Sequence, residues 1–351
     1  MSPGRPGASY GRCAVGAVKM IHVTENLHAS AALSRRDTPT PSSRLAAVAA
    51  YRPARSVDSS ELASRWAVDA QWVERRVGVR RRGVADASES VCAMATAAAR
   101  KALAESGVTA DQVDAVVVAS CSAPSPMPST AAWVAAELGL GSPGVFDLNA
   151  ACGGFCYALA VADGLIKAGT AHCMLVVGAE RMTDWVDPED RDTAPVFADG
   201  AGAALVTRAE RPGIHPTVWG SDGTRAGLIT IPAREGQLRM EGRAVYRWAL
   251  DSLADVARQA CLRAGLQPGD LKGFVPHQAN LRMIEAVAGQ LGAEQAVVAR
   301  DITEAGNTSA ASVPMALDAL RRGGELAPGD PVLLLGFGAG LSYAAQVVNC
   351  P

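Results

Sequence analysis

The stretch FDLNAACGGF, residues 146–155, indicates the fold because a second stretch, RDITEAGNTSAAS at residues 300–312, has the same predicted local structure. Each begins with a strand, passes through a turn and continues as a helix. Similarity over a period of roughly 130 to 150 residues is far too long for a solenoid repeat, and it indicates two fused copies of one α/β unit. The two copies are expected to face each other about a pseudo-two-fold axis.

Further matched segments extend this internal repeat. AAWVAAELGL (131–140) matches IEAVAGQLGA (284–293), GAGAALV (200–206) matches GAGLSYAAQVV (338–348), and GFVPHQAN (273–280) takes the position of VVVASCSAPSP (116–126). The last pair lies at the carboxyl ends of strands. Ligands bind at such strand ends in open α/β sheets, so this end of the two units is the expected site.

Short apolar strands alternate with helices along most of the chain. This order indicates a parallel or mixed sheet that helices cover on both faces, so the predicted fold class is α/β. Strands are expected at 45–53, 113–120, 144–148, 173–180, 200–206, 271–277, 297–302, 331–340 and 341–348. Helices are expected at 58–66, 87–106, 130–140, after Cys152, at 244–265 and 280–292, and from near Ser309.

The composition is that of a globular chain of 351 residues, 49% hydrophobic and 19% charged. The formal net charge is -2, so neither nucleic acid nor an anionic membrane surface is an expected partner. No apolar run reaches the roughly 20 residues of a membrane-spanning helix, and the N-terminus lacks a signal-peptide pattern. We therefore expect a cytoplasmic protein.

The chain divides into three parts. Residues 1–43 mix Gly, Pro, Ser, Thr and Arg without periodicity and are predicted to form a flexible tail. Residues 44–215 are the predicted N-terminal half, which carries the nucleophilic cysteine. Residues 216–351 are the predicted C-terminal half, which carries a histidine and an asparagine of the same site.

The eight cysteines are too sparse for a disulfide scaffold, and no CxxC pair offers zinc spacing, so no metal site is expected. Cys152 lies where a strand-like segment ends and a helix-like one begins. Unpaired N–H groups and the helix dipole there favour a thiolate, which predicts a lowered pKa. Gly153 and Gly154 are interpreted as leaving room for a bulky acyl group. Cys156, one turn further on, is predicted to point into the core.

His277 and Asn307 are the two polar residues that the repeat brings towards Cys152. His277 follows a strand and begins a short polar turn that includes Asn280. Asn307 precedes a helix, where Thr308 and Ser309 could act as caps and leave the Asn amide free. Each residue alone is a weak signal, but their matched positions in the repeat predict one site formed by all three.

Four motifs resemble those of the β-ketoacyl-acyl-carrier-protein synthase III family: NAACGGF, VPHQANLR, GNTSAAS and GFGAGLSY. The match runs from about residue 44 to the C-terminus, with the motifs in the family's order and spacing. The resemblance implies a thiolase-like fold, in which two pseudo-two-fold-related α/β halves form a five-layered αβαβα arrangement. It also implies an acyltransferase that initiates fatty acid or polyketide synthesis.

The implied reaction has two stages. Cys152 attacks a primer acyl-CoA, and the backbone N–H groups of Cys152 and Ala339 form the oxyanion hole. Malonyl-acyl-carrier protein then enters, and His277 and Asn307 donate hydrogen bonds to the enolate that forms as carbon dioxide leaves. The carbanion attacks the acyl group, giving a β-ketoacyl product in a decarboxylative Claisen condensation. No cofactor is implied, since the coenzyme A thioester is a substrate.

The resemblance also implies secondary sites. Trp72 and Arg191 would stack on the adenine of coenzyme A, Arg76 would meet its phosphates, and Asn280 would join them. Arg282 would dock the acidic carrier protein. The implied assembly is a homodimer in which Met127 caps the acyl pocket of the other subunit, where its pliable side chain would admit a longer or branched primer.

Several alternatives compete with this interpretation. Cys, His and Asn follow the chain order of papain-like thiol peptidases, but that fold has no duplicated α/β unit. Thiolases and hydroxymethylglutaryl-CoA synthases use a second cysteine or a glutamate base, whereas the GFGAG turn has no Cys and Glu180 is interpreted as structural. An acyltransferase of the same fold that moves an acyl group to a carrier protein, hydroxyl or amine without condensation stays open.

Overall fold

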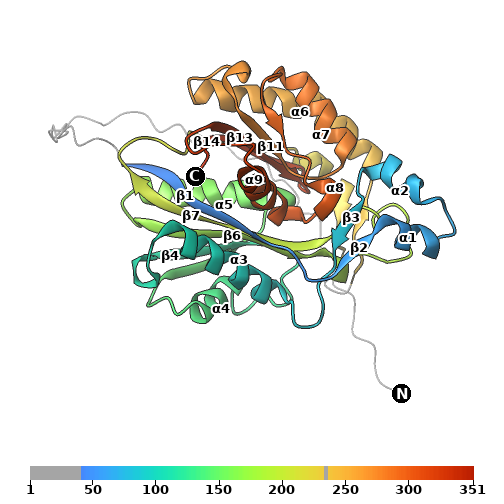
Figure 1. Cartoon of the computed structure of the whole chain (residues 1–351), viewed down its shortest axis with the longest axis horizontal. Helices are drawn as coiled ribbons and strands as arrows, with labels where there is room; N and C mark the ends of the chain where they lie inside the picture. Colours follow the sequence, from blue (N-terminus) through green and yellow to red (C-terminus); the bar gives the residue numbers. More distant parts are fainter. Residues whose placement is uncertain (1–40, 233–235) are drawn as a thin grey trace, which may run out of the picture. The chain divides into compact units, whose positions relative to one another are not determined.

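The computed structural model describes residues 41–232 and 236–351 (Figure 1). Most of the predicted tail, 1–43, lies outside the described residues, but its end does not, because β1 (Ser42–Tyr51) begins at Ser42. Ser43 is fully buried, and its hydroxyl donates to Asp163 Oδ1 at 2.7 Å. The strand therefore starts before the predicted boundary, since a buried polar contact holds its first residues in place.

The first five-stranded sheet has the order β1-β7-β6-β4-β5. Its strands after β1 are β4 (Ala115–Ala119), β5 (Gly144–Leu148), β6 (Cys173–Arg181) and β7 (Asp199–Ala209). β4 pairs in parallel with β5 and β6, whereas β7 is antiparallel to β6 and β1. The helices that belong to this sheet are α3 (Val91–Ser106), α4 (Thr130–Glu137) and α5 (Gly154–Lys167).

The second five-stranded sheet has the order β12-β11-β13-β14-β8. Its strands are β8 (Val218–Ser221), β11 (Gly273–Pro276), β12 (Val297–Val298), β13 (Pro331–Gly338) and β14 (Ser342–Asn349). Its helices are α6 (Gly242–Arg263), α7 (Leu281–Leu291) and α9 (Ser312–Arg322). β11 pairs in parallel with β12 and β13, and β14 is antiparallel to β13 and β8, as in the first sheet.

The strand pairing also defines which residues of the two sheets are equivalent. Ala115 of β4 pairs with Met174 of β6, and the first residue of β11, Gly273, pairs with Val332 of β13. Counting along β6 and β13 from these pairs makes Glu180 equivalent to Gly338. The internal repeat predicted from the sequence is therefore present residue by residue at the strand ends.

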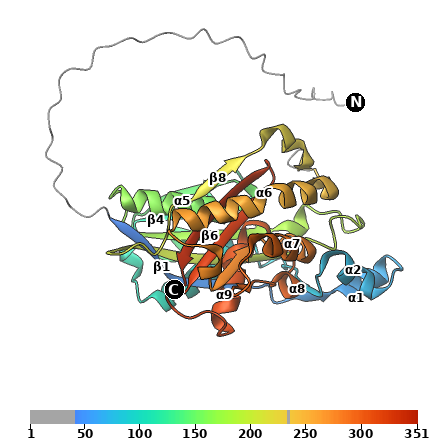
Figure 2. The same cartoon turned by 90° about the horizontal axis from the view of Figure 1, so that it is seen from above.

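Helices and sheets form five layers (Figures 1 and 2). α3 and α4 pack on the outer face of the first sheet, α5 and α9 contact both sheets from between them, and α6 and α7 cover the outer face of the second sheet. One apolar cluster fills the middle of the molecule and two others lie beneath the outer helices. The predicted αβαβα arrangement is confirmed.

Shorter elements surround the site and the turns. They are β2 (Ser56–Asp58), α1 (Ser59–Arg65), α2 (Ala70–Val77), β3 (Arg81–Gly83), β9 (Ile229–Thr230), β10 (Arg239–Met240) and α8 (Ile302–Ala305). Single 3-10 turns are η1 (Ala110–Gln112), η2 (Ala151–Gly153), η3 (Met182–Asp184), η4 (Gly223–Leu228), η5 (Pro268–Asp270) and η6 (Ser309–Ala311).

Two predicted elements differ most from the observed ones. The strand expected at 297–302 is only β12, because Ile302 already begins α8. The helix expected from residue 87 begins at Val91, where the Ser90 side chain accepts a hydrogen bond from the Ala93 N–H at 3.1 Å and caps the helix. No helix in the described ranges is long and apolar enough to cross a membrane.

Candidate active site

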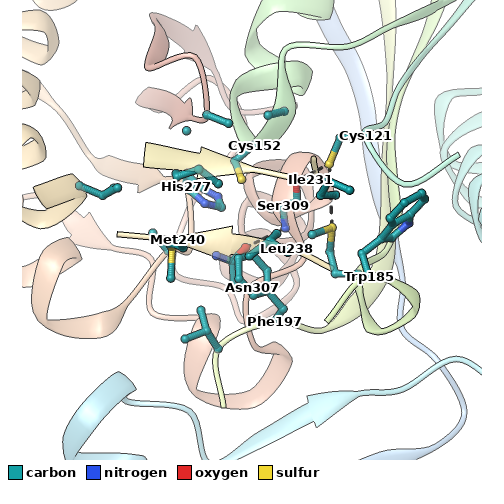
Figure 3. A pocket seen from close by; sticks show the side chains of 18 of the residues that line it. Cys121, Cys152, Trp185, Phe197, Ile231, Leu238, Met240, His277, Asn307 and Ser309 are labelled. Atoms are coloured by element: carbon teal, nitrogen blue, oxygen red, sulfur yellow. Dashed lines mark hydrogen bonds between the residues drawn. The ribbon is translucent and has the colours of Figure 1, made fainter. Parts of the chain in front are cut away.

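A cavity of about 1580 Å³ opens where β4, β11, β13 and the turns η2 and η6 meet. Cys152, His277 and Asn307 all line this cavity. Figure 3 shows their side chains pointing towards the same space, with Ser309 beside them. The structure thus brings together the three residues that the repeat predicts as one site, although they come from distant parts of the chain.

The turns η2 and η6 are built in the same way. In each, an asparagine side-chain oxygen accepts a hydrogen bond from the N–H two residues later: Asn149 from Ala151 at 3.0 Å, and Asn307 from Ser309 at 2.8 Å. Ala151 and Ser309 both have a positive φ, 45° and 49°. Aligning NAACGG with NTSAAS would have revealed that the asparagines are equivalent, a signal the sequence analysis missed. Cys152 is consequently equivalent to Ala310.

The Cys152 thiol is half-buried, facing the cavity from deep inside the protein. The pKa of Cys152 is raised to about 12, mainly by burial and in smaller part by the nearby Glu180 carboxylate, although Ser309 acts to lower it. The predicted lowered pKa is therefore wrong, because desolvation outweighs the helix N-terminus. Cys152 is a thiol at pH 7, and its proton must leave as the sulfur attacks.

The glycines around Cys152 serve close packing rather than substrate access. A Cβ on Gly154 would lie 3.1 Å from the Cβ of Ala119, because α5 packs directly against β4. A Cβ on Gly338 would lie 2.7 Å from the Cβ of Cys152. Gly153 and Gly154 do not line the cavity, so the interpretation that they leave room for an acyl group is wrong, whereas Gly338 is needed beside the nucleophile.

His277 is held in one orientation by two neighbours. Its Nδ1 lies 2.7 Å from the Ser312 hydroxyl, and its ring packs edge-on against Phe337 with centroids 5.2 Å apart. Because the Ser312 oxygen already accepts the Gln278 N–H at 3.3 Å, we assign the Ser312 proton to the contact with Nδ1, which places the His277 proton on Nε2. Burial lowers the pKa of His277 to about 3, so the imidazole is neutral at pH 7.

Asn307 is fixed by both its backbone and its side chain. Its N–H donates to Val196 at 2.9 Å, and its carbonyl accepts the Ala198 N–H at 2.9 Å. Because its side-chain oxygen is occupied by the Ser309 N–H, the amide nitrogen Nδ2 is the end that faces the cavity. The cavity therefore holds two neutral donors, the Nε2–H of His277 and the Nδ2–H of Asn307.

The cavity mouth contains some of the predicted coenzyme A residues. Arg76, Asn280 and Arg282 line it, while Trp72 and Arg191 lie outside the lining. The Arg76 guanidinium lies 5.0 Å from the centroid of the Trp72 ring and is paired with Asp192. Arg76 therefore stacks on Trp72 in this structure, and the adenine contact of Trp72 and Arg191 stays a prediction.

The other two predicted mouth residues have local contacts. Arg191 donates to the Trp66 carbonyl at 2.9 Å. Asn280 caps α7, because its side chain accepts from the Arg282 N–H at 3.0 Å. Arg243 and Arg247 also line the mouth, and the sequence analysis missed them. Their spacing of four in RAVYR places them on one face of α6, and this spacing was the available signal.

The inner end of the cavity is apolar. Its side chains include Cys121, Met182, Trp185, Phe197, Ile231, Leu238 and Met240. Most are labelled in Figure 3. Met127 does not line the cavity of its own chain, and 81% of its surface is exposed. Its predicted contact with a partner subunit therefore stays a prediction.

The seven cysteines in the described part of the chain are all free thiols. Cys156 is fully buried in the central apolar cluster, as its position one turn into the helix indicates. Cys121 and Cys152 are the two that line the cavity among these residues. Nowhere within 41–232 or 236–351 do three or more His, Cys, Asp or Glu side chains gather in a way that could hold a metal ion.

The fold and the site define a class of protein: a duplicated α/β enzyme of the thiolase fold with a cysteine facing a neutral His and an Asn amide. Residues 146–223 match the family model described as 3-Oxoacyl-[acyl-carrier-protein (ACP)] synthase III, and residues 261–350 match the model of its C-terminal part. The chain belongs to the β-ketoacyl-acyl-carrier-protein synthase III family of acyltransferases.

Relatives cover most of the chain. Beta-ketoacyl-[acyl-carrier-protein] synthase III 4 of Streptomyces coelicolor is 49% identical over 312 residues, which cover 88% of this chain and 99% of the relative. The mycobacterial enzyme of Mycobacterium marinum is 42% identical over 319 residues, 88% of this chain and 95% of the relative. The priming β-ketosynthase of the R1128 polyketide pathway matches in structure with a TM-score of 0.85 at 43% identity, covering 88% and 96% of the two chains.

Proposed function

We propose that this chain catalyses the decarboxylative Claisen condensation of a primer acyl-CoA with malonyl-acyl-carrier protein, through an acyl group on Cys152. The observation that carries the proposal is the arrangement of one thiol and two neutral hydrogen-bond donors around a single cavity. The names of the family's relatives and of the priming ketosynthase support the same reaction.

Acylation of Cys152 comes first. The sulfur attacks the thioester carbonyl of the primer, the bond from that carbon to the coenzyme A sulfur breaks, and the thiol proton ends on coenzyme A. The N–H groups of Cys152 and Ala339 are proposed to hold the oxyanion. Ala339 lines the cavity directly after Gly338, whose α-carbon lies against Cys152, so this part of β13 is close enough to take that role.

Decarboxylation follows when the malonyl group occupies the cavity. Its thioester oxygen would accept hydrogen bonds from His277 Nε2 and Asn307 Nδ2, and these bonds strengthen as the carboxylate leaves and the oxygen gains charge. A neutral imidazole suits this task, since an imidazolium would be a stronger acid and would protonate the carbanion. The carbanion then attacks the acyl carbon, and the Cys152 sulfur leaves.

The mouth and the inner end fit the two substrates. Arg76, Arg243, Arg247 and Arg282 would meet the phosphates of coenzyme A and the acidic carrier protein, with Trp72, Arg191 and Asn280 as further proposed contacts. The apolar inner end would hold the primer acyl chain, and its pliable Met182 and Met240 suit a chain longer than acetyl.

A second copy of the chain is the proposed partner of the β5 edge. β5 is an edge strand of the first sheet, and exposed apolar side chains lie near it: Trp133 on α4 is 54% exposed, and Val145 on β5 is 38% exposed. Met127, in the loop before α4, is more exposed still. An exposed apolar edge is typically covered by a partner, and in a homodimer Met127 would reach the neighbouring acyl pocket.

The proposal is tested by separating the two stages in the Asn307→Asp variant. An aspartate can still accept the Ser309 N–H but offers a carboxylate where the enolate needs a donor. We expect Cys152 acylation to stay within about threefold of wild type and malonyl decarboxylation to fall roughly 100-fold or more. The matched control is Asn349→Asp, at the last residue of β14 and outside the cavity lining, which should change neither stage. Full decarboxylation by Asn307→Asp would contradict the role of Asn307.

A further inference from the structure

Glu180, at the end of β6, is a fully buried carboxylate that the proposed reaction does not use. Its Oε1 accepts the Ser309 hydroxyl at 3.0 Å and the Cys121 thiol at 3.3 Å. Its Oε2 accepts the Ser120 hydroxyl at 3.1 Å, the Ser122 N–H at 3.0 Å and the Ser122 hydroxyl. The Cys121 N–H donates to both oxygens at 3.1 Å. No cation is among these donors in the described part of the chain.

The carboxylate links the two halves of the site. Ser120, Cys121 and Ser122 directly follow β4 in the first half, whereas Ser309 begins η6 in the second. Burial raises the pKa of Glu180, while its many donors stabilise the charged form. Burying a carboxylate lowers the stability of the fold unless hydrogen bonds compensate for the lost hydration. The presence of Glu180 here therefore indicates a functional role in addition to packing.

Ser309 transmits the position of Glu180 to two functional side chains. Its hydroxyl is held by Glu180, and its N–H donates to Asn307 Oδ1 at 2.8 Å, which turns the Asn307 amide nitrogen into the cavity. Ser309 also lies beside Cys152 (Figure 3), and its hydroxyl lowers the pKa of that thiol. Its φ of 49° is a strained conformation for a residue with a side chain, so Ser309 needs an anchor to hold it there.

The internal repeat shows that the fold itself does not require an acid here. The residue equivalent to Glu180 in the other sheet is Gly338, which lies against Cys152. One strand end therefore carries a glycine against which Cys152 packs directly, and the other carries a carboxylate that contacts the Asn307 turn.

We propose that Glu180 is a positioning residue for the condensation, which holds Asn307 and Cys152 in one geometry through the Ser309 hydroxyl. The proposal rests on the proposed function for the role of Asn307 in decarboxylation. It goes beyond it by assigning a role to a residue that the sequence analysis interpreted as structural.

The charge of Glu180 gives the proposal a signature that a packing role lacks. Two titratable groups face the carboxylate among the described residues, the thiols of Cys121 and Cys152, and its negative charge raises the pKa of both. Glu180→Gln should therefore make Cys152 ionise at lower pH. The same variant should also leave the Asn307 side chain less firmly held, because the anchor of Ser309 is weakened. Ser309→Ala should also loosen Asn307, but it should make Cys152 ionise at higher pH, because the Ser309 hydroxyl lowers the pKa of this thiol.

The experiment measures both effects in the full-length protein. The first readout is the rate of Cys152 alkylation by iodoacetamide from pH 6 to 10, followed by mass spectrometry of the Cys152 peptide. The second is decarboxylation of malonyl-acyl-carrier protein. Both variants should lose roughly tenfold in decarboxylation, their alkylation profiles should shift in opposite directions, and the double variant should lose less than the product of the single losses.

Glu89→Gln is the matched control. Glu89 is also buried and accepts Tyr51 O–H at 2.7 Å and Ala54 N–H at 2.9 Å, but it lies outside the cavity lining. Glu89→Gln should lower the stability of the protein and leave both Cys152 alkylation and malonyl decarboxylation unchanged. Ser309→Ala keeps the test open if Glu180→Gln does not fold, and the equivalent Ala151, at φ 45°, shows that alanine can adopt this backbone conformation.

Three outcomes would overturn the proposal: unchanged decarboxylation in the two site variants, alkylation profiles that shift in the same direction, or equal effects of Glu89→Gln. Failure of the proposed function looks different. In that case the wild-type protein does not decarboxylate malonyl-acyl-carrier protein at all, and the alkylation profiles alone decide whether Glu180 acts on Cys152 through Ser309.

Discussion

The turns η2 and η6 share one backbone and have different chemistry. Both use an asparagine to hold the N–H two residues later, both place that later residue at positive φ, and both lead into a central helix. In η2 the following position is Cys152, which faces the cavity. In η6 it is Ala310, which is fully buried, and the asparagine supplies the functional group instead.

This difference shows how a duplicated unit becomes asymmetric. The strand ends under the two turns carry Gly338 and Glu180 at equivalent positions, so one turn packs directly on its strand end and the other is held by a charged side chain. The third polar residue, His277, has Ala119 as its equivalent, by the same count along β4 and β11. The first half thus supplies the thiol, and the second half supplies the imidazole and the functional amide.

The largest expected effect comes from moving the thiol between the turns. Cys152→Ala should slow acyl loading by roughly 1000-fold or more, because the nucleophile is lost. Adding Ala310→Cys to that variant should restore nothing, since position 310 is fully buried although its backbone matches. Acyl transfer from radiolabelled acyl-CoA to protein measures both. Loading at residue 310 would show that the turns are interchangeable, contrary to this comparison.

A smaller effect is expected from adding a side chain at Gly338, where Cys152 of η2 packs on β13. The Cβ of Gly338→Ala would lie 2.7 Å from the Cβ of Cys152 and must displace it, which should slow acylation about 100-fold. Gly164→Ala, on the helix that follows Cys152, is the matched control because a Cβ there meets no atom within 4 Å. Single-turnover acylation and thermal unfolding of both variants check this. Normal acylation by Gly338→Ala would refute the need for glycine.

The sequence predicted the duplicated α/β fold and the convergence of the three central polar residues because both follow from repeated strand–turn–helix patterns, whereas the five layers followed from the family resemblance. It did not predict β8, since VWGS is short and carries the exposed Trp219, nor α2 and β3 within a run of arginines. The expected direction of the Cys152 pKa shift was wrong, because desolvation depends on tertiary burial. The apolar end of the cavity was also missed, since its residues come from separate loops whose convergence no local pattern indicates.

Acid should destabilise the fold through His277. Burial lowers the pKa of His277 to about 3 from 6.5, so only the unfolded state takes up this proton between those values, and stability falls as the pH drops below 6.5. Between pH 7 and pH 5 the loss should be about 2 kcal/mol. His277→Gln has no imidazole to titrate. Its free energy of unfolding, measured in urea, should therefore fall by about 2 kcal/mol less than that of the wild type between pH 7 and pH 5. Parallel pH profiles for the two proteins would mean that His277 is protonated in the fold.

The smallest effect is expected at the proposed subunit contact. Met127→Phe replaces a pliable side chain with a rigid ring, and it should shift the primer preference towards acetyl-CoA over isobutyryl- and longer esters by roughly tenfold or less. Met127→Leu is the control of similar volume. Competition assays with mixed acyl-CoA esters, together with sedimentation of both variants, measure this. An unchanged preference in a dimeric Met127→Phe variant would exclude Met127 as the gate.

In the proposed reaction, Cys152 carries an acyl group that a malonyl-derived carbanion then takes. Intact-protein mass spectrometry after incubation with a panel of acyl-CoA esters, before and after addition of malonyl-acyl-carrier protein, follows this transfer. We expect one acyl adduct on Cys152 that disappears as β-ketoacyl-acyl-carrier protein and carbon dioxide form. An adduct on another residue, or one released only to a hydroxyl or amine acceptor without decarboxylation, would contradict it.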